Sequence, residues 1–216
     1  MEQILLLRLE GPMQSWGTHS KWGNRDSALF PTKSGIIGLL ACAQGLERQN
    51  PEISRLNDAV KVFVRADRPG TLAVDYQTVT GVLPTADGKN RGNKGEVTTI
   101  ITPRQFLQDA SFLVAVSGSA DVLEKCKNAL EHPVWTIYLG RKSFVPSVPV
   151  LIGLTSDYDS PEAVMHTYPL GSGAHPPILY QSGDEDGSIQ ADELVDIVSG
   201  QYRERRVSVK TAIEEV

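Results

Sequence analysis

Residues 34–46 read SGIIGLLACAQGL, an apolar run that is longer than a typical strand. Its small residues permit close packing against a neighbouring element, so we predict a buried helix here with Ser34 as its N-cap. We expect an apolar strand before this helix, at 3–9, because a Gly-Pro breaker follows that run. After the helix, alternating apolar residues predict a strand at 59–66, and β-branched and aromatic residues predict another at 71–79.

A second strand and helix follow later in the chain. Residues 112–116 form an apolar strand candidate, and residues 119–130 place apolar side chains on one helical face. Between the two halves, residues 84–96 read PTADGKNRGNKGE and offer almost nothing to bury. They predict a mobile loop or hairpin tip between a strand that ends near Val82 and one that starts at Val97. This order of elements predicts an α+β fold of the ferredoxin-like or RNA-recognition type.

The chain is expected to divide into two parts. We assign residues 1–150 to one domain and residues 151–216 to a short, β-rich C-terminal extension packed on it. Short strand candidates lie near and within the second part, at 148–154, 178–180 and 205–210. An acidic stretch, at 184–186 and 192–196, is expected to form a solvated loop and a short helix.

Charge is distributed unevenly along the chain. The 216 residues carry 21 Lys and Arg against 26 Asp and Glu, a net charge of −5, and 40% of them are hydrophobic, which excludes a disordered chain. Residues 1–142 carry +3, whereas residues 143–216 carry −8. Because salt screens charges beyond about 10 Å, binding of a polyanion depends on the local potential. The net acidity therefore does not exclude a nucleic-acid partner.

Several classes of protein are excluded by pattern. No apolar run approaches the roughly 18 residues that span a bilayer, and the N-terminal run lacks the basic region of a signal peptide, so we expect a cytoplasmic protein without a membrane partner. Cys42 and Cys126 lack C-x-x-C spacing, and no pair of histidines has helical metal spacing. We therefore expect no disulfide scaffold, no metal site and no cofactor.

The start of the long helix is a candidate anion site. Residues 32–35 read TKSG before a helix, but the glycines of a full phosphate-binding loop are missing, which disfavours an NTPase or another small-molecule enzyme. Lys33 and Ser34 at a helix N-terminus can still hold one backbone phosphate. A plain N-cap explains the same residues equally well.

A second candidate lies at residues 139–143, LGRKS. Gly140 beside Arg141, Lys142 and Ser143 would allow the backbone to approach an anion closely while the side chains neutralise it.

Six segments together carry a specific resemblance. They resemble the Cas five family of RAMP (repeat-associated) proteins, in the form found in type I-E CRISPR Cascade complexes. The match runs in order from residue 5 to about 150, and its segments are LLRLEGPMQSWG (6–17), Arg25, FPTKSGIIGLL (30–40), DYQTV (75–79), TPRQFLQDASF (102–112) and YLGRKS (138–143).

The resemblance implies a RAMP-type ferredoxin-like domain with an extended β-hairpin thumb. Residues 80–100 fit the thumb, and its candidate functional residues are Val82, Leu83, Lys89, Arg91 and Lys94. The implied role is non-catalytic RNA binding in antiviral defence. The subunit would grip the 5′ handle of the crRNA and cap the backbone filament, with the CasC backbone subunit, the CasA large subunit and, indirectly, target DNA as partners.

A catalytic alternative stays open. Other subtypes of the family cleave RNA with a Tyr/Lys/His constellation, so the chain could be a metal-independent endoribonuclease that processes CRISPR repeat RNA. Tyr76 and a histidine would then act as acid and base. No histidine can be placed near Tyr76 from the sequence.

Single-stranded RNA is held by cations that follow its phosphates and by planar groups that stack on its bases. Some candidates have a structural alternative: Trp16 is at least as plausible as a core anchor, Arg25 could form a structural ion pair, and the thumb cations could be a solubilising tip. If the thumb enters between guide and target, Val82 and Leu83 would act as wedges. The RNA-binding candidates are Gln14, Trp16, Arg25, Lys33, Ser34, Arg104, Arg141, Lys142 and Ser143.

Overall fold

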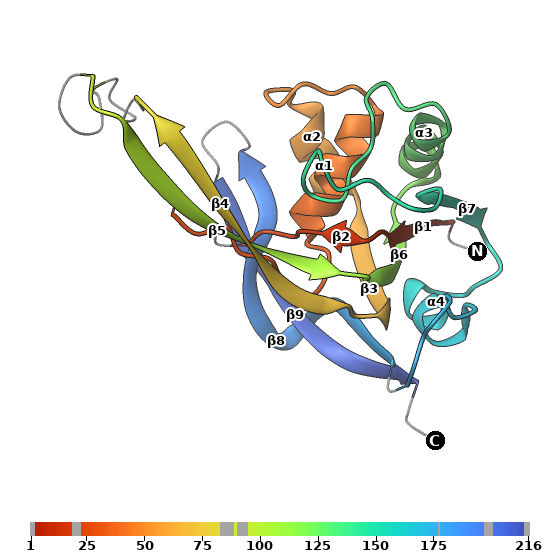
Figure 1. Ribbon diagram of the computed structural model, residues 1–216. Coiled ribbons are helices and arrows are strands. Elements are labelled where there is room, and N and C mark those ends of the chain that lie inside the picture. The colour runs from red at the N-terminus through yellow and green to blue at the C-terminus, as the bar shows by residue number, and fades with distance from the viewer. Residues whose placement is uncertain are drawn as a thin grey trace.

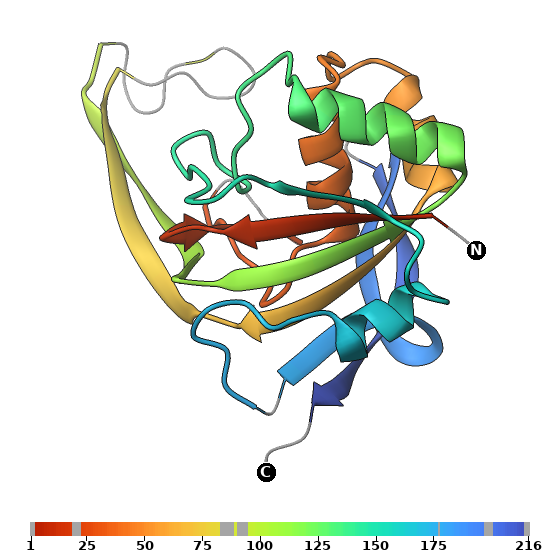
Figure 2. The same ribbon diagram turned by 90° about the vertical axis from the view of Figure 1, so that its right-hand side faces the viewer.

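The computed structural model describes residues 3–18, 23–82, 89, 95–176, 178–196 and 201–213. It is an α+β structure built on a six-stranded antiparallel sheet (Figures 1 and 2). The strands lie in the order β7-β1-β6-β3-β8-β9, with bounds Leu151–Thr155, Ile4–Glu10, Ser111–Ser117, Lys61–Arg68, Ile178–Asp196 and Gln201–Ile213.

Alternation along the strands builds a core on each face of this sheet. Leu5, Leu7 and Leu9 of β1 pack with three helices, α1 (Lys33–Ala43), α2 (Glu52–Ala59) and α3 (Ala120–Glu131). Ile4 and Leu6 face the other way and pack with α4 (Pro161–Thr167). Figure 2 shows the three helices on one side of the sheet and α4 on the other.

A second, three-stranded sheet carries a long hairpin. Its strand order is β2-β5-β4, where β2 is Met13–Gln14, β4 is Thr71–Gly81 and β5 is Thr98–Gln108. The two long strands pair without interruption from Thr71↔Gln108 to Gly81↔Thr98. Figure 1 shows this hairpin extending away from the six-stranded sheet. The hairpin therefore begins earlier and ends later than the predicted 80–100 segment, which is its outer part.

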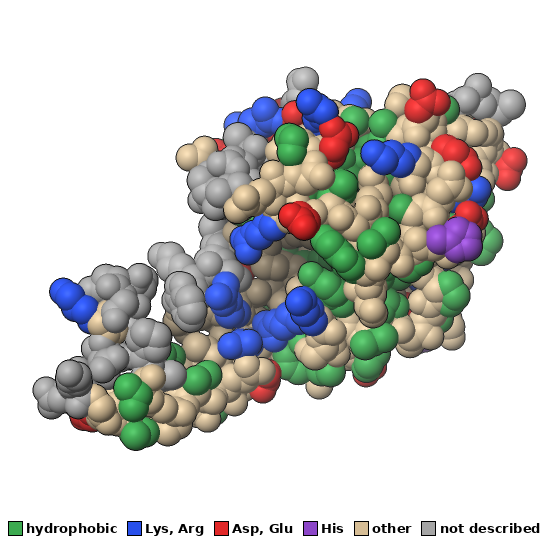
Figure 3. All heavy atoms as spheres, turned by 90° about the horizontal axis from the view of Figure 1, so that it is seen from above, with side chains coloured by type: hydrophobic (Ala, Val, Ile, Leu, Met, Phe, Trp, Pro, Cys, Tyr) green, Lys and Arg blue, Asp and Glu red, His purple; other side chains and the backbone are tan. Residues whose placement is uncertain are grey.

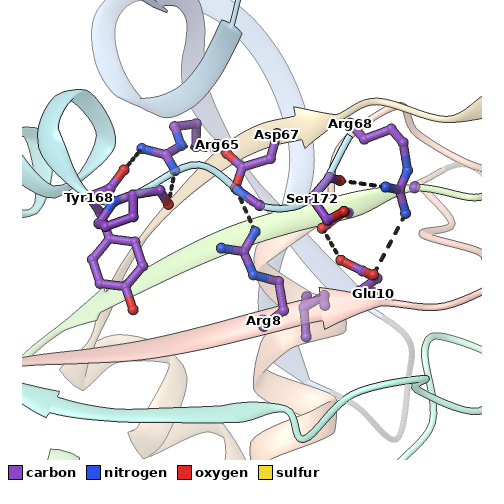
Figure 4. Close-up of polar contacts among 12 residues, drawn as sticks. Arg8, Glu10, Arg65, Asp67, Arg68, Tyr168 and Ser172 are labelled. Atoms are coloured by element: carbon purple, nitrogen blue, oxygen red, sulfur yellow. Dashed lines mark hydrogen bonds and ion pairs between the residues drawn. The ribbon is translucent and has the colours of Figure 1, made fainter. Parts of the chain in front are cut away.

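Buried ion pairs and hydrogen bonds connect strands β1 and β3 to the last residues of α4 and the segment after it (Figure 4). Arg65 is fully buried and donates to Asp67 at 2.6 Å and to the carbonyl oxygens of Met165 and Tyr168 at 2.9 and 2.8 Å. Asp67 also accepts from Arg8 at 2.6 Å. Burial alone would raise the pKa of the Asp67 carboxyl, but the hydrogen bonds from Arg65 and Arg8 hold it below its usual range.

The predicted strands at 3–9, 59–66, 71–79 and 112–116 and the predicted helices at 34–46 and 119–130 are confirmed, with bounds shifted by a few residues. Two helices were not predicted, although α4 carries a recognisable start signal. Ser160 is its N-cap, with Pro161 at the first helical position. α2 likewise follows Pro51, and Asn50 accepts a hydrogen bond from the backbone N–H of Glu52.

The prediction for the acidic C-terminal stretch is wrong. Residues 184–186 and 192–196 belong to β8, which pairs with β9 along most of its length and with β3 at one end. Arg205 and Arg203 of β9 pair with Asp192 and Glu193 of β8, and the stretch is a strand rather than a solvated loop and a helix. The expected short strands at 178–180 and 205–210 are parts of these two long strands.

Candidate nucleic-acid interface

The N-terminus of α1 is occupied by carboxylates of β8. Thr32, rather than the predicted Ser34, is the N-cap, and its side chain accepts from the backbone N–H of Gly35. The backbone N–H of Lys33 donates to Asp192 at 2.8 Å, and the Lys33 Nζ atom lies 2.8 Å from Glu193. Lys33 is only 7% exposed. The predicted phosphate contact of Lys33 is therefore replaced by an internal ion pair, while half-buried Ser34 donates to Thr32 at 3.4 Å.

The C-terminal arginines complete this ion-pair network. Arg205 donates to both carboxylate oxygens of Asp192, at 2.5 and 2.9 Å, and Arg203 donates to Glu193 at 2.8 Å. Burial would raise the pKa of Glu193, but the hydrogen bonds from Lys33 and Arg203 hold it below its usual range. The network thus joins the β8–β9 hairpin to the start of α1.

Gln14 and Trp16 are core residues in this structure. Gln14 donates to the carbonyl oxygens of Leu9 and Ala110, at 3.1 and 2.8 Å, and accepts from the Trp16 indole N–H at 3.2 Å. Gln14 is 0% exposed and Trp16 is 1% exposed. Trp16 therefore fits the core-anchor alternative, and neither side chain reaches the surface.

Three of the predicted arginines come together at the base of the hairpin. The backbone of Arg25 pairs with β5, since its N–H donates to Pro103 at 3.0 Å and its carbonyl accepts from Gln105 at 2.7 Å. Arg104 lies in the same part of β5. The Arg141 guanidinium donates to the carbonyl oxygen of Gln105 at 2.8 Å. Three separate segments therefore converge; we call Arg25, Arg104 and Arg141 the arginine cluster.

The electrostatics of Arg141 show how close these charges are. Burial is the main cause that lowers its pKa, and the positive charges of Arg104 and Arg25 lower it further. Asp75, which lies opposite Arg104 in the hairpin, acts in the other direction. Figure 3 shows Lys and Arg side chains gathered around a hollow between the hairpin and the body of the protein. Binding of an anion among these cations would relieve their mutual repulsion.

Gly140 positions Arg141 by a close approach to the protein's own backbone. Its φ is +87°, and a Cβ at this position would lie 1.7 Å from the carbonyl oxygen of Ser15. Leu139 accepts from the Ser15 N–H at 3.1 Å, and Phe144 donates to the Arg141 carbonyl at 2.8 Å. The glycine is therefore required, but the backbone it approaches is that of Ser15 rather than an anion.

The remaining candidates lie at the surface or outside the described residues. Lys142 and Ser143, which follow Arg141 in the chain, are exposed, and so are Val82 and Lys89 in the outer part of the hairpin. Leu83, Arg91 and Lys94 fall outside the described residues.

Two aromatic residues near Lys142, Trp135 and Tyr138, were not among the RNA-binding candidates. Trp135 is 43% exposed, and it lines a hollow with half-buried Tyr138 and exposed Lys142. Tyr138 is the first residue of a segment that carries the resemblance, whereas an exposed tryptophan cannot be told from a core tryptophan by its neighbours in sequence.

Within the described ranges, no group of three or more His, Cys, Asp or Glu side chains could hold a metal ion. Over the same residues, no helix has the length and apolar character needed to cross a membrane. Cys42 and Cys126 are free thiols.

Comparisons with known proteins agree on one family. A family model described as CRISPR-associated protein (Cas_Cas5) matches residues 4–208. The chain is 35% identical over 183 residues to the CRISPR system Cascade subunit CasD of Escherichia coli strain K12, covering 79% of this chain and 80% of that protein.

Two solved structures are also similar over nearly the whole chain. One, from a CRISPR RNA-guided surveillance complex, has a TM-score of 0.79 and 35% identity and covers 96% of this chain and 89% of that chain. The other, a crystal structure of a Cas protein, has a TM-score of 0.72 and 33% identity and covers 99% and 98%, respectively.

Proposed function

This chain belongs to the Cas5 family of CRISPR-associated proteins, and from that premise we propose that it is a non-catalytic, crRNA-binding subunit of a Cascade-type surveillance complex. In this role it grips the 5′ handle of the crRNA and caps the backbone filament in antiviral defence. A relative named as a Cascade subunit and a similar structure from an RNA-guided complex support the proposal.

We also propose that the body of the protein is the RAMP-type ferredoxin-like unit and that the β4–β5 hairpin is its thumb. The strand order β7-β1-β6-β3, with helices after β1 and β6, supports this assignment. β7 then serves as the fourth strand, so the unit extends slightly past residue 150, and the β8–β9 hairpin is the extension.

The arginine cluster is the observation that carries the RNA-binding proposal. Three guanidinium groups from distant segments lie close together, and exposed Lys142 follows Arg141 in the chain; the negative charge of Asp75 acts on Arg141. Such a group of cations suits consecutive phosphates of single-stranded RNA, because each phosphate carries a negative charge. Two acids of β8, Asp192 and Glu193, are engaged with Lys33 and the β9 arginines.

The hairpin offers a surface for protein partners. Leu72, Val74 and Tyr76 alternate along β4 and therefore share one face, where they are 44%, 59% and 65% exposed. We propose that neighbouring CasC and CasA subunits of the complex are the protein partners and that target DNA is contacted indirectly. Exposed apolar side chains on a projecting hairpin support a protein contact.

The non-catalytic part of the proposal rests on the family and on the surroundings of Tyr76. Tyr76 is on the hairpin, whereas His166 contacts the Ala212 carbonyl at 3.0 Å and the Tyr180 ring near α4. That arrangement gives no support to an acid–base pair of Tyr76 with His166.

Incubation of the purified full chain with labelled CRISPR repeat RNA in EDTA tests both parts of the proposal. We expect saturable binding that weakens with salt and RNA that stays intact. Cleavage at a defined position, lost in a Tyr76→Phe variant, would establish the endoribonuclease alternative. Absence of binding at low salt would contradict the RNA-binding role.

A further inference from the structure

Gln105 of β5 is the point at which the segments that form the arginine cluster are joined. Its backbone N–H donates to the Arg25 carbonyl oxygen at 2.7 Å, and its own carbonyl oxygen accepts from the Arg141 guanidinium at 2.8 Å and from the Ser15 hydroxyl at 3.2 Å. Its side-chain oxygen accepts from the backbone N–H of Ser27 at 3.3 Å. One residue therefore contacts three segments that lie far apart in the sequence.

Only one of these hydrogen bonds depends on the side chain of Gln105, the one from Ser27. Ser27 is 9% exposed, and its hydroxyl accepts from the backbone N–H of Trp16 at 3.0 Å, so this part of the chain is packed into the body of the protein. A buried N–H that has no acceptor is unfavourable. The side-chain oxygen of Gln105 therefore stabilises the segment that follows Arg25 in its place beside β5.

The arginine cluster needs such contacts because its members repel one another. Burial first, and then the positive charges of Arg104 and Arg25, lower the pKa of Arg141, so the three cations lie close together. Like charges at short range separate unless other contacts hold them in place. Gln105 is uncharged, so it holds the segments together without offsetting the positive charge that attracts a polyanion.

We propose that Gln105 is a positioning residue of the RNA-binding surface, whose side-chain oxygen holds Arg25 beside the other two arginines of the cluster. This inference rests on the proposed crRNA-binding function and names a residue through which that function works. Gln105 acts through Arg25 and needs no contact of its own with RNA. With Arg25 in place, the three cations of the cluster can meet successive phosphates of one strand.

Gln105→Met tests the inference, because methionine keeps the length of the side chain and removes the acceptor. Gln108→Met is the matched control, since Gln108 is an exposed glutamine at the end of the same strand. The first readout is the rate of trypsin cleavage after Arg25 without RNA, at a temperature where both variants are folded. We expect cleavage to be several-fold faster in Gln105→Met, because proteolysis requires local opening of the chain.

The second readout is the salt dependence of binding to labelled repeat RNA. In Gln105→Met the slope of log K against log salt should fall by about 0.7, the value for one phosphate of single-stranded RNA. Arg25→Ala should lower the slope by the same amount, and Gln105→Met added to it should lower the slope no further. An additional fall of similar size in the double variant would overturn the inference, as would equal slopes or equal cleavage rates for Gln105→Met and its control.

Gln105→Glu separates the position of Arg25 from the charge of the surface. Glutamate keeps an acceptor for the Ser27 N–H, so trypsin should cleave after Arg25 as slowly as in the wild type. RNA binding should nevertheless weaken, because the new negative charge lies beside the arginines. Fast cleavage of Gln105→Glu would overturn the inference, since the acceptor would not be what holds the segment.

The cleavage assay also separates this inference from the proposed function, because it contains no RNA. Absence of RNA binding by the wild type, together with faster cleavage of Gln105→Met, would overturn the proposed function and still assign the position of Arg25 to Gln105. RNA binding by the wild type with cleavage rates that do not respond to Gln105→Met would leave the proposed function standing and overturn the inference.

Discussion

Asp192 accepts a hydrogen bond from the backbone N–H of Lys33 at 2.8 Å, joining a carboxylate of β8 to the N-terminus of α1 across 159 residues of sequence. The same carboxylate pairs with Arg205. A helix N-terminus favours a negative charge, so the protein fills with its own side chain the position where the sequence suggests a phosphate.

Asp192→Ala should therefore destabilise the fold without a direct effect on an RNA contact. It leaves Arg205 without its carboxylate and the first turn of α1 without its acceptor, and we expect a loss of about 3 kcal/mol in the free energy of unfolding. Urea denaturation measures this loss. Asp157→Ala, which changes an exposed carboxylate paired with Thr155, is the matched control. An unfolding midpoint equal to that of the control would show that the contact is dispensable.

Arg104→Ala combined with Arg141→Ala should weaken binding of repeat RNA and flatten its dependence on salt. If each arginine neutralises one phosphate of single-stranded RNA, the slope of log K against log salt should fall by about 1.4. The matched control is Lys125→Ala with Lys127→Ala, which removes two cations from α3. Binding isotherms at several salt concentrations give the slope, and equal slopes for the two double variants would exclude the cluster from the RNA site.

Gly140→Ala should disturb the turn that presents Arg141. The new methyl group collides with the Ser15 carbonyl, and alanine is strained at a φ of +87°. We expect a loss of more than about 1 kcal/mol in the free energy of unfolding, together with weaker RNA binding. Thermal melts compare it with Gly38→Ala, which we expect to be stabilising by up to about 1 kcal/mol. Similar effects of the two substitutions would refute the role assigned to Gly140.

Asp67 should make the protein sensitive to acid. Its pKa is lower in the folded chain than in the unfolded chain, where the ordinary value is about 3.9. The stabilisation is therefore complete above that value and is lost as the pH falls through the folded pKa. In Asp67→Asn, the free energy of unfolding should be lower at neutral pH and should change less between about pH 5 and 2. A pH profile parallel to that of the wild type would argue against this role.

Much of the fold could be predicted from local pattern. The apolar residues of β3, which is buried on both faces, and the continuous apolar character of α1 reflect burial that a sequence window reveals directly. β8 could not be predicted in this way, because Asp192 and Glu193 pair with Arg205 and Arg203 of β9, which a window of local sequence does not show. The short helix α4 was missed although its Ser-Pro start is a known signal.

The candidate site was likewise predictable from the sequence only in part. Arg25, Arg104 and Arg141 were chosen as cations in matched segments, but their convergence follows from the pairing of residue 25 with β5 and the contact of Arg141 with Gln105. Trp16 and Lys33 have the residue types of RNA contacts, yet burial and an ion pair engage them internally.

The sequence by itself determined the α+β class, most elements, the family and the segments that carry positive charge, because periodicity, composition and motif spacing are local properties. Only the tertiary structure decided which cations face solvent, which are neutralised by carboxylates, and that Trp135, Tyr138 and Lys142 line one hollow. The physical reason is that burial and electrostatic potential depend on distances in space. Tertiary packing sets those distances between residues more than a hundred positions apart, as it does for Lys33 of α1 and Asp192 of β8.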